Sequence, residues 1–396
     1  MLNALNGFCT KLAEQLASPG VVLPWLLSSL GIPAGFSAWL VPLKNTGSLF
    51  PQLLMATRIK QAQKSHPFWV FAGITQGILL IALGLVLPYL PTPAVGWAVL
   101  ITILLFSVAS GVGSIAFKDV LAKTIPKSRR GRLLATRATG GGLLTLLVGS
   151  YFYWQGQQQE DLTTFTTLLV AAGALWIGAA LLYSLTLEPN AKPQASQGLV
   201  SELRQGLYLL REDVPFRRFL AARILLMAIP LSHPFLVLFA KEQTGGRWQD
   251  LGLFVIIAGV SATLSSPFWG RFSDRSAKGL MGVVALLGML ILGYAVSFAY
   301  WPSDWKSTYT ILPAFFLITM AHGGARLGRK TYLVNYAPAK ARALYLAVAN
   351  TTLGLFTLLS GLLSFFVTEG ALQWILVWLM ACLAGAAWLS FRLPKA

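Results

Sequence analysis

Long runs of apolar residues, separated by short charged or polar segments, dominate the chain. Clear examples cover residues 68–90, 95–117, 163–187 and 281–299. Each is close to the ~20 residues that a helix needs to cross the ~30 Å hydrocarbon core of a bilayer. The runs are too long for buried strands, and they lack the apolar–polar alternation of a membrane β-barrel. The pattern therefore predicts an all-α integral membrane protein.

Breaks at charged clusters, Pro/Gly pairs and polar runs divide the chain into about twelve transmembrane helices. Lys44 and Arg137 interrupt the second and the fifth of them, which are the least regular. The expected limits are 11–31, 35–57, 67–87, 95–117, 133–154, 163–185, 217–240, 251–270, 279–299, 308–328, 341–366 and 371–391.

The composition and the distribution of charge predict how these helices are oriented across the membrane. Only 11% of the residues are charged, whereas about a quarter of a soluble domain is charged. The net charge of +18 is unevenly distributed, because five loops hold 21 Lys and Arg residues and the alternate loops hold three. The five basic loops are 58–66, 118–132, 186–218, 271–278 and 329–342. Cytoplasmic loops carry such an excess, so we expect a multi-pass protein of the cytoplasmic membrane with both termini cytoplasmic, and no nucleic-acid partner.

A polar linker divides the predicted spans into two sets of six. The segment EPNAKPQASQG, which starts at Glu188, has the composition of a linker. In the stretch that follows, leucine recurs at helical spacing beneath charged residues, which is typical of an amphipathic helix at a membrane surface. We expect an N-terminal half at 1–187, a cytoplasmic linker at 188–216 and a C-terminal half at 217–396.

The two halves are related by a weak internal repeat. An offset of 212 residues superposes KDVLAKTIPKSRRGRLL on KTYLVNYAPAKARALYL, so that Pro126 meets Pro338. A looser match sets the segment 47–60 against 263–275. Two six-helix halves of the same orientation predict parallel repeats with a site between them at mid-membrane depth.

The segment GRFSDRSAKG, after the eighth predicted span, resembles a signature of the major facilitator superfamily, a Gly-x-x-x-Asp-Arg loop followed by a cation. The matching residues, which by this resemblance form a cytoplasmic gate, are Gly270, Asp274, Arg275 and Lys278. The first-half copy LLMATRIKQAQK lacks the aspartate, and ATGGGLLTLLVG on the fifth span lacks the proline of the family's antiporter signature. The resemblance implies two parallel six-helix repeats that rock around a central cavity.

Ionisable side chains at membrane depth mark candidate functional sites, because their burial in lipid is costly. Lys44 is the deepest cation, roughly 21 Å along its helix from Arg58 at 1.5 Å per residue. It either binds an anionic group in the cavity or extends its stem towards the interface. Glu14 is the first-half carboxylate best placed to bind and release a proton; the alternative is an interfacial ion pair with Lys11 at i, i+3.

The remaining candidates are histidines and arginines. His233 lies between two prolines in AIPLSHPFLV, where a broken helix predicts a cavity. It is a candidate proton relay or substrate donor, or else a buried ring satisfied by a neighbouring hydroxyl. His322 and Arg326 on the tenth span and Arg137 on the fifth either face the cavity, where arginine suits carboxylate or phosphate, or extend to the interface.

The sequence shows no nucleotide-binding loop, no paired carboxylates and no cluster with metal-ligand spacing. We therefore expect neither an enzyme nor an ATP-driven pump, and no cofactor beyond a proton or other ion gradient. The excess of cations at membrane depth favours an anionic or zwitterionic small organic solute, moved by a proton-coupled transporter that acts as a monomer in the bilayer. Two alternatives stay open: a proton-coupled exporter of lipophilic compounds that uses Glu14, and a sensor or assembly factor that keeps the fold without transport.

Overall fold

The computed structural model describes residues 2–154, 162–190, 199–338, 341–362 and 372–395, which form helices and no strand. The helices of the N-terminal half are α1 (Leu2–Leu16), α2 (Val22–Ser29), α3 (Ala34–Gln61), α4 (His66–Val86), the short η1 (Leu87–Tyr89), α5 (Thr92–Thr124), α6 (Lys127–Trp154) and α7 (Leu162–Ser184). Those that follow are α8 (Leu199–Glu212), α9 (Val214–Leu225), α10 (Ala228–Thr244), α11 (Trp248–Arg275), α12 (Ala277–Ser297), the short η2 (Phe298–Tyr300) and η3 (Ser303–Trp305), α13 (Thr308–Tyr336), α14 (Arg342–Ser360) and α15 (Leu372–Phe391).

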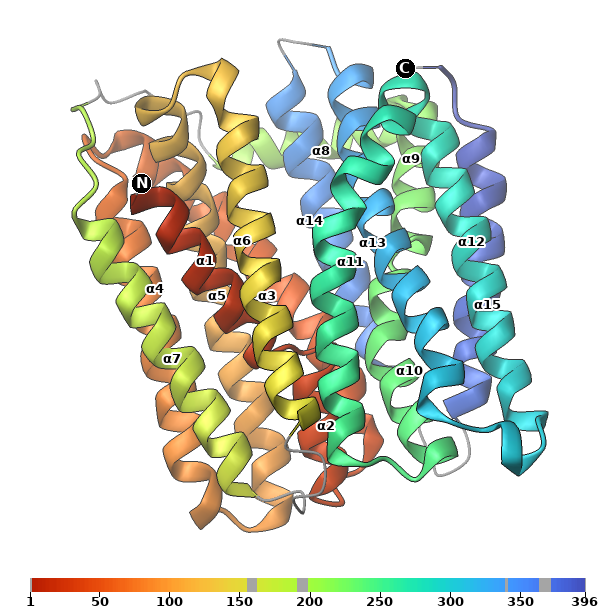
Figure 1. The fold of residues 1–396 in the computed structure, drawn as a ribbon. Coiled ribbons are helices and arrows are strands. Elements are labelled where there is room, and N and C mark those ends of the chain that lie inside the picture. Colours follow the sequence, from red (N-terminus) through yellow and green to blue (C-terminus); the bar gives the residue numbers. More distant parts are fainter. Residues whose placement is uncertain (1, 155–161, 191–198, 339–340, 363–371, 396) are drawn as a thin grey trace.

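Two helical bundles lie side by side (Figure 1), one made of α1–α7 and the other of α9–α15. Both termini lie at the same end of the molecule, at the top of the view. We call this end the terminal face and the opposite end the distal face. The amphipathic helix α8 runs crosswise at the terminal face, and in the sequence it connects the first bundle to the second.

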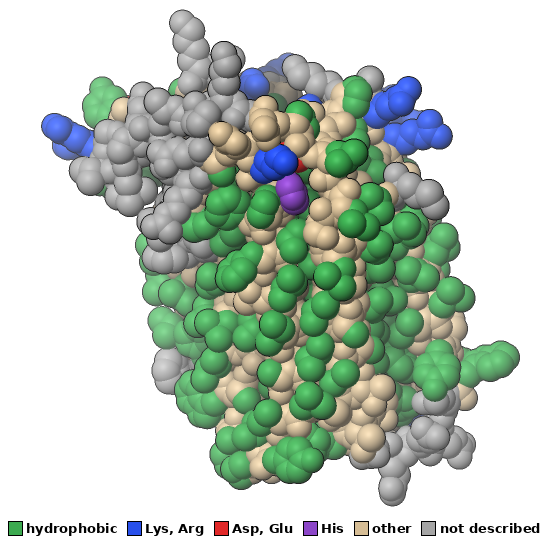
Figure 2. Space-filling model, turned by 90° about the vertical axis from the view of Figure 1, so that its left-hand side faces the viewer, with side chains coloured by type: hydrophobic (Ala, Val, Ile, Leu, Met, Phe, Trp, Pro, Cys, Tyr) green, Lys and Arg blue, Asp and Glu red, His purple; other side chains and the backbone are tan. Residues whose placement is uncertain are grey.

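The flanks of the bundles are suited to lipid. Nine helices of the described chain are long and apolar enough to cross a membrane. The three other predicted spans are the broken helix α1–α2, the charged α3, and α14, whose apolar part Leu344–Ser360 is shorter. In Figure 2, apolar side chains cover the flank of the N-terminal half, and Lys and Arg gather at the terminal face. The structure is thus the predicted all-α membrane protein with two six-span halves.

The first span of each half is interrupted. α1 ends at Leu16 and α2 begins at Val22, with Pro19 and Gly20 in the link. The first span thus begins nine residues before the expected position 11, and its break frees backbone groups near mid-membrane. In the second half α9 ends at Leu225 and α10 begins at Ala228. In a membrane protein built of two repeated halves, helix breaks at equivalent positions indicate a binding site.

Glycines let the two bundles approach closely at α6 and α11. Gly142 and Gly149 of α6 face Gly259 and Gly252 of α11, respectively. A Cβ on Gly252 would lie only 2.6 Å from the backbone nitrogen of Tyr153. Small residues at such crossings allow backbone-to-backbone packing of membrane helices. Both α6 glycines belong to the segment ATGGGLLTLLVG of the fifth predicted span.

Further contacts between the halves lie at mid-depth or nearer the distal face. Thr46 of α3 donates a hydrogen bond of 2.9 Å to the carbonyl of Gly354 on α14. The Nζ atom of Lys241 donates to Ser29 Oγ over 2.8 Å and lies 4.7 Å from the centre of the Trp25 ring. The bundles are therefore packed together on the distal side of the middle.

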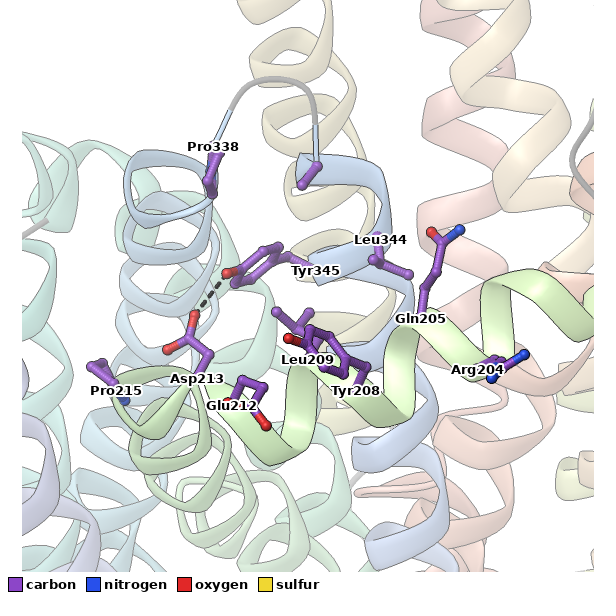
Figure 3. A pocket seen from close by; sticks show the side chains of 11 residues that line it. Arg204, Gln205, Tyr208, Leu209, Glu212, Asp213, Pro215, Pro338, Leu344 and Tyr345 are labelled. Carbon is purple, nitrogen blue, oxygen red and sulfur yellow. Dashed lines mark hydrogen bonds between the residues drawn. The ribbon is translucent and has the colours of Figure 1, made fainter.

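At the terminal face, Asp213 joins three helices of the C-terminal half. Its carboxylate caps α9 by accepting the N–H of Phe216 at 2.8 Å, and it accepts the hydroxyls of Tyr336 (2.6 Å) and Tyr345 (2.7 Å). The cap explains why α9 begins at Val214, three residues before the expected start of the seventh span. Figure 3 shows the Asp213–Tyr345 hydrogen bond beside a groove of about 800 Å³, which is lined by α8 and by residues at the start of α14.

A second carboxylate, Glu188, plays the same part in the N-terminal half. It accepts the backbone N–H groups of Ser65 and His66 at 2.8 Å each, at the start of α4, and the Nζ of Lys123 at 3.0 Å. Lys123 also pairs with Asp119. Burial raises the pKa of Glu188, but the hydrogen bonds from His66, Ser65 and Lys123 outweigh burial and hold that pKa below its ordinary value. Glu188 therefore belongs structurally to the first bundle.

We expect Glu188→Gln to lower the free energy of unfolding by roughly 2–3 kcal/mol at neutral pH, since charged hydrogen bonds contribute about 1.5–3 kcal/mol each. A carboxylate with a lowered pKa stabilises the fold above its unfolded pKa, and this contribution is lost as the pH falls below 4.5. Thermal unfolding in detergent as a function of pH checks both points. The control is Glu242→Gln, at an exposed residue. An equal difference in the free energy of unfolding between wild type and Glu188→Gln at pH 7 and at pH 3.5 would contradict the prediction.

Candidate substrate site

A cavity of about 280 Å³ lies between the two halves. Its walls come from the link between α1 and α2 and from α3 on one side, and from α10, α11 and α13 on the other. It therefore lies at the helix breaks of both halves. Phe315 lines its distal end and packs edge-on against Phe254, with 4.9 Å between ring centres.

One stripe of α13 supplies most of the polar wall. Phe315, Thr319, His322, Arg326 and Arg329 all line the cavity and recur every three or four residues. Residues at this spacing share one face of a helix. Since α13 runs from the distal to the terminal face, the stripe passes from an aromatic ring to histidine and then to two arginines. The cations therefore lie on the terminal side of the cavity.

His233 faces this stripe from α10. The ring centres of His233 and His322 are 5.5 Å apart, and His233 is only 8% exposed. The Nδ1 atom of His233 lies 2.9 Å from the carbonyl of Ile229, and Nε2 lies 3.3 Å from the hydroxyl of Thr319. His233 thus lines the cavity and also lies beside a neighbouring hydroxyl, so its position agrees with both sequence-based interpretations.

Lys44 lines the cavity from α3. It makes no hydrogen bond or ion pair with another described residue, so its ammonium is available to a ligand. Glu14 lines a small neighbouring cavity with Lys44 and is paired with Lys11 at 2.6 Å, as one of its two interpretations predicts. Glu14 does not line the central cavity itself.

Arg137 lies elsewhere. Its guanidinium donates to the carbonyl of Asn3 at 2.6 Å and to Asn6 Oδ1 at 3.0 Å, and stacks 4.4 Å from the centre of the Phe117 ring. These contacts join α6 to α1 and α5. Arg137 is therefore placed as a packing residue of the N-terminal half in this conformation, and it is not among the residues that line the central cavity.

The charged side chains described in the lining of the cavity are all basic. The lining includes the basic side chains of Lys44, Arg326 and Arg329, and no carboxylate is among the described residues that line it. More cations follow towards the terminal face, where Lys330 is repelled by Arg326 and by Lys118 of the opposite half. Such a lining of one sign attracts an oppositely charged solute.

The predicted gate residues lie at the terminal face, where α11 ends and α12 begins. Asp274 and Arg275 are exposed and form no hydrogen bond or ion pair with any residue that the structure describes. Lys278 donates to the carbonyl of Leu393 over 2.6 Å and so ties α12 to the segment after α15. Gly270 has open space where a Cβ would lie. Within the part of the chain that the structure describes, neither Asp274 nor Arg275 ties this loop to the other half.

Sequence comparison decides the family. The sequence model described as Major Facilitator Superfamily matches residues 4–361. The chain belongs to the Major Facilitator Superfamily. It is a membrane transporter by family and fold, with a small-molecule solute implied.

Relatives are distant. An uncharacterized protein of Mycobacterium tuberculosis (strain ATCC 25618 / H37Rv), Rv2209, is 26% identical over 405 residues, which cover 99% of this chain and 76% of the relative. The multidrug resistance protein MdtG of Dickeya zeae (strain Ech586) is 24% identical over 226 residues, covering 55% of this chain and 52% of that protein.

Solved structures match in fold. A mutant of the nucleoside transporter NupG superposes with a TM-score of 0.75 at 14% identity, covering 100% of this chain and 98% of NupG. A D-xylose-proton symporter gives a TM-score of 0.69 at 16% identity, covering 100% of this chain and 96% of the symporter. At these identities the likeness concerns the fold alone.

Thr319 and Arg329 are among the polar lining residues that sequence reasoning missed. Both lie on the same face of α13 as His322 and Arg326, at spacings of three or four residues. The helical spacing of polar residues along the predicted tenth span was the available signal. Arg329 was counted among the loop residues, because the helix extends to Tyr336 instead of ending near 328.

Proposed function

We propose that this member of the Major Facilitator Superfamily is a secondary active transporter of a small organic anion or zwitterion, coupled to protons. The observation that carries the proposal is the central cavity, with three basic side chains, two histidines and no carboxylate among its described lining residues. A charged substrate group held by such cations gains hydrogen bonds of about 1.5–3 kcal/mol each. The volume of about 280 Å³ is at the lower end of ligand pockets, which favours a small solute.

The direction of the molecule in the membrane is part of the proposal. Because basic loops lie in the cytoplasm, the terminal face is the cytoplasmic side of the cytoplasmic membrane. The two halves are packed together on the distal side, through Gly149 and Gly252 and through the Lys241–Ser29 contact. The conformation is then one in which a cytoplasmic anion meets the cations of α13 first. Alternation with a state closed at the terminal face would carry the anion across.

A second candidate is export of lipophilic compounds, which the similarity to MdtG over about half of the chain favours. In that case Glu14 would carry the proton. The cavity weighs against a cationic drug, because Lys44 and the two arginines would repel it. The ion pair of Glu14 with Lys11 also occupies the carboxylate in this conformation.

The test is a binding and transport panel on purified protein: succinate, inorganic phosphate, a hexose phosphate, a zwitterionic amino acid and the lipophilic cation ethidium. We expect thermal stabilisation and proteoliposome counterflow with at least one anion or zwitterion. Lys44→Gln should weaken binding of that solute by roughly tenfold or more, because one charged hydrogen bond is lost. The exposed Lys64→Gln is the matched control. Transport of ethidium alone would favour the exporter, and transport unaffected by Lys44→Gln would remove Lys44 from the site.

A further inference from the structure

The protonation geometry of His233 is fixed by its helix. The carbonyl of Ile229 can only accept a hydrogen bond, so the His233 Nδ1 atom, 2.9 Å away, carries a hydrogen. Pro234 has no N–H, so the carbonyl of Pro230 lacks its usual helical donor. This turn of α10 therefore has a backbone carbonyl without a helical donor that can accept a hydrogen bond. The remaining nitrogen, Nε2, is therefore the atom of His233 that gains or loses a proton.

The Thr319 hydroxyl can form a hydrogen bond with both the neutral and the protonated form of the His233 ring. Its hydroxyl lies 3.3 Å from His233 Nε2 and 2.8 Å from the carbonyl of Phe315. When His233 is neutral, the hydroxyl can donate to Nε2. When Nε2 is protonated, the ring donates to the threonine oxygen, and the hydroxyl donates to Phe315. One rotation of the hydroxyl thus follows the proton without leaving a buried polar atom unpaired.

Among the described residues, every charged side chain that faces the two histidines is basic. Arg326 and Arg329 lie on α13 beyond His322, and Lys44 lies on α3. The lining residues of α11 and of the link between α1 and α2 include no titratable side chain. A further positive charge on either ring is repelled by these cations. An anion bound among them removes much of that repulsion, so anion binding and proton binding favour each other.

We propose that the His233–His322 pair is the proton-binding site of this transporter and that it takes up a proton together with the anionic substrate. This inference rests on the proposed function, of which it names the coupling group. The proton comes from solvent and forms an N–H bond on a ring; its positive charge is carried beside the anion, and both leave together. The anion and the proton would therefore move in the same direction, with Glu14 as a spectator.

The test uses succinate and inorganic phosphate as probes of purified wild-type protein. Succinate is used between about pH 6.5 and 8.5, where both of its carboxylates are ionised. We expect uptake of about one proton per bound succinate, measured by calorimetry in buffers of different ionisation enthalpy, and an affinity that rises up to tenfold per pH unit of acidification. In proteoliposomes an inwardly directed proton gradient should drive accumulation.

The variants separate coupling from binding. His233→Gln and His322→Gln should bind succinate with an affinity that no longer rises on acidification, and should lose proton uptake and gradient-driven accumulation, whereas Glu14→Gln should keep all three. His322 makes no hydrogen bond with a described residue, so its variant remains informative where His233→Gln folds poorly. Absence of binding by wild type of every anion and zwitterion in the panel would overturn the proposed function and this inference with it. Binding without proton uptake, or uptake lost in Glu14→Gln and kept in both histidine variants, would overturn this inference alone.

Discussion

The substitution Gly252→Ala is expected to slow transport at least about tenfold and to open the cavity towards the distal face. The added Cβ would lie 2.6 Å from the backbone nitrogen of Tyr153 and 2.9 Å from the carbonyl of Gly149. Backbone atoms of α6 cannot rotate away as a side chain can, so α6 and α11 must separate near their distal ends. Overpacking of this kind costs about 1–3 kcal/mol, which shifts a conformational equilibrium by roughly 5- to 150-fold.

The measurement is the reactivity of one cysteine. Ala258 lines the cavity on α11, and Ala258→Cys is the single thiol once Cys9 and Cys382 are replaced by alanine. A membrane-impermeant thiol reagent added on the distal side should react with it much faster in Gly252→Ala. A Cβ on Gly178 of α7 would meet no described atom within 4 Å, so Gly178→Ala is the matched control. Equal reactivity in both variants, with unchanged transport, would show that the crossing does not hold the distal side closed.

The topology could be predicted from the sequence because it depends on the lengths of apolar runs and on the sides where charges gather. Both signals are local, and membrane insertion enforces them strongly. The broken helix expected at His233 was misplaced: the break lies between α9 and α10, at residues 226–227, and α10 continues through His233 and Pro234. The first span is interrupted at Pro19 and Gly20, inside the expected limits 11–31, but the helix before them begins at Leu2.

The direction of each charged side chain could not be predicted in the same way. Arg137 and Arg326 are both cations inside the terminal boundary, yet Arg326 lines the cavity while Arg137 donates to Asn3 and Asn6 of α1. The difference depends on which helix packs against each face, and that is a property of the tertiary arrangement. The carboxylates Glu188 and Asp213 were assigned to the linker for a related reason, because Ser65 and Tyr336, to which they are hydrogen-bonded, each lie 123 residues away in the sequence.

Asp213→Asn is expected to lower the free energy of unfolding by roughly 2–4 kcal/mol, which is the combined effect of a weakened helix cap and two lost charged hydrogen bonds. The carboxylate holds the start of α9 to Tyr336 at the end of α13 and to Tyr345 at the start of α14. An amide offers one oxygen in place of two, and its NH2 group is turned towards a donor. At least one tyrosine hydroxyl then loses its acceptor in a partly buried place.

Thermal unfolding in detergent measures the loss, which should appear as a decrease of roughly 5–10 °C in Tm. Glu212→Gln is the control, because Glu212 is exposed and precedes Asp213 directly. Tyr336→Phe and Tyr345→Phe should each cost less than Asp213→Asn, and either one should cost little more when the carboxylate is already absent. Additive losses in these double variants would mean that the tyrosines stabilise the terminal face through contacts other than Asp213.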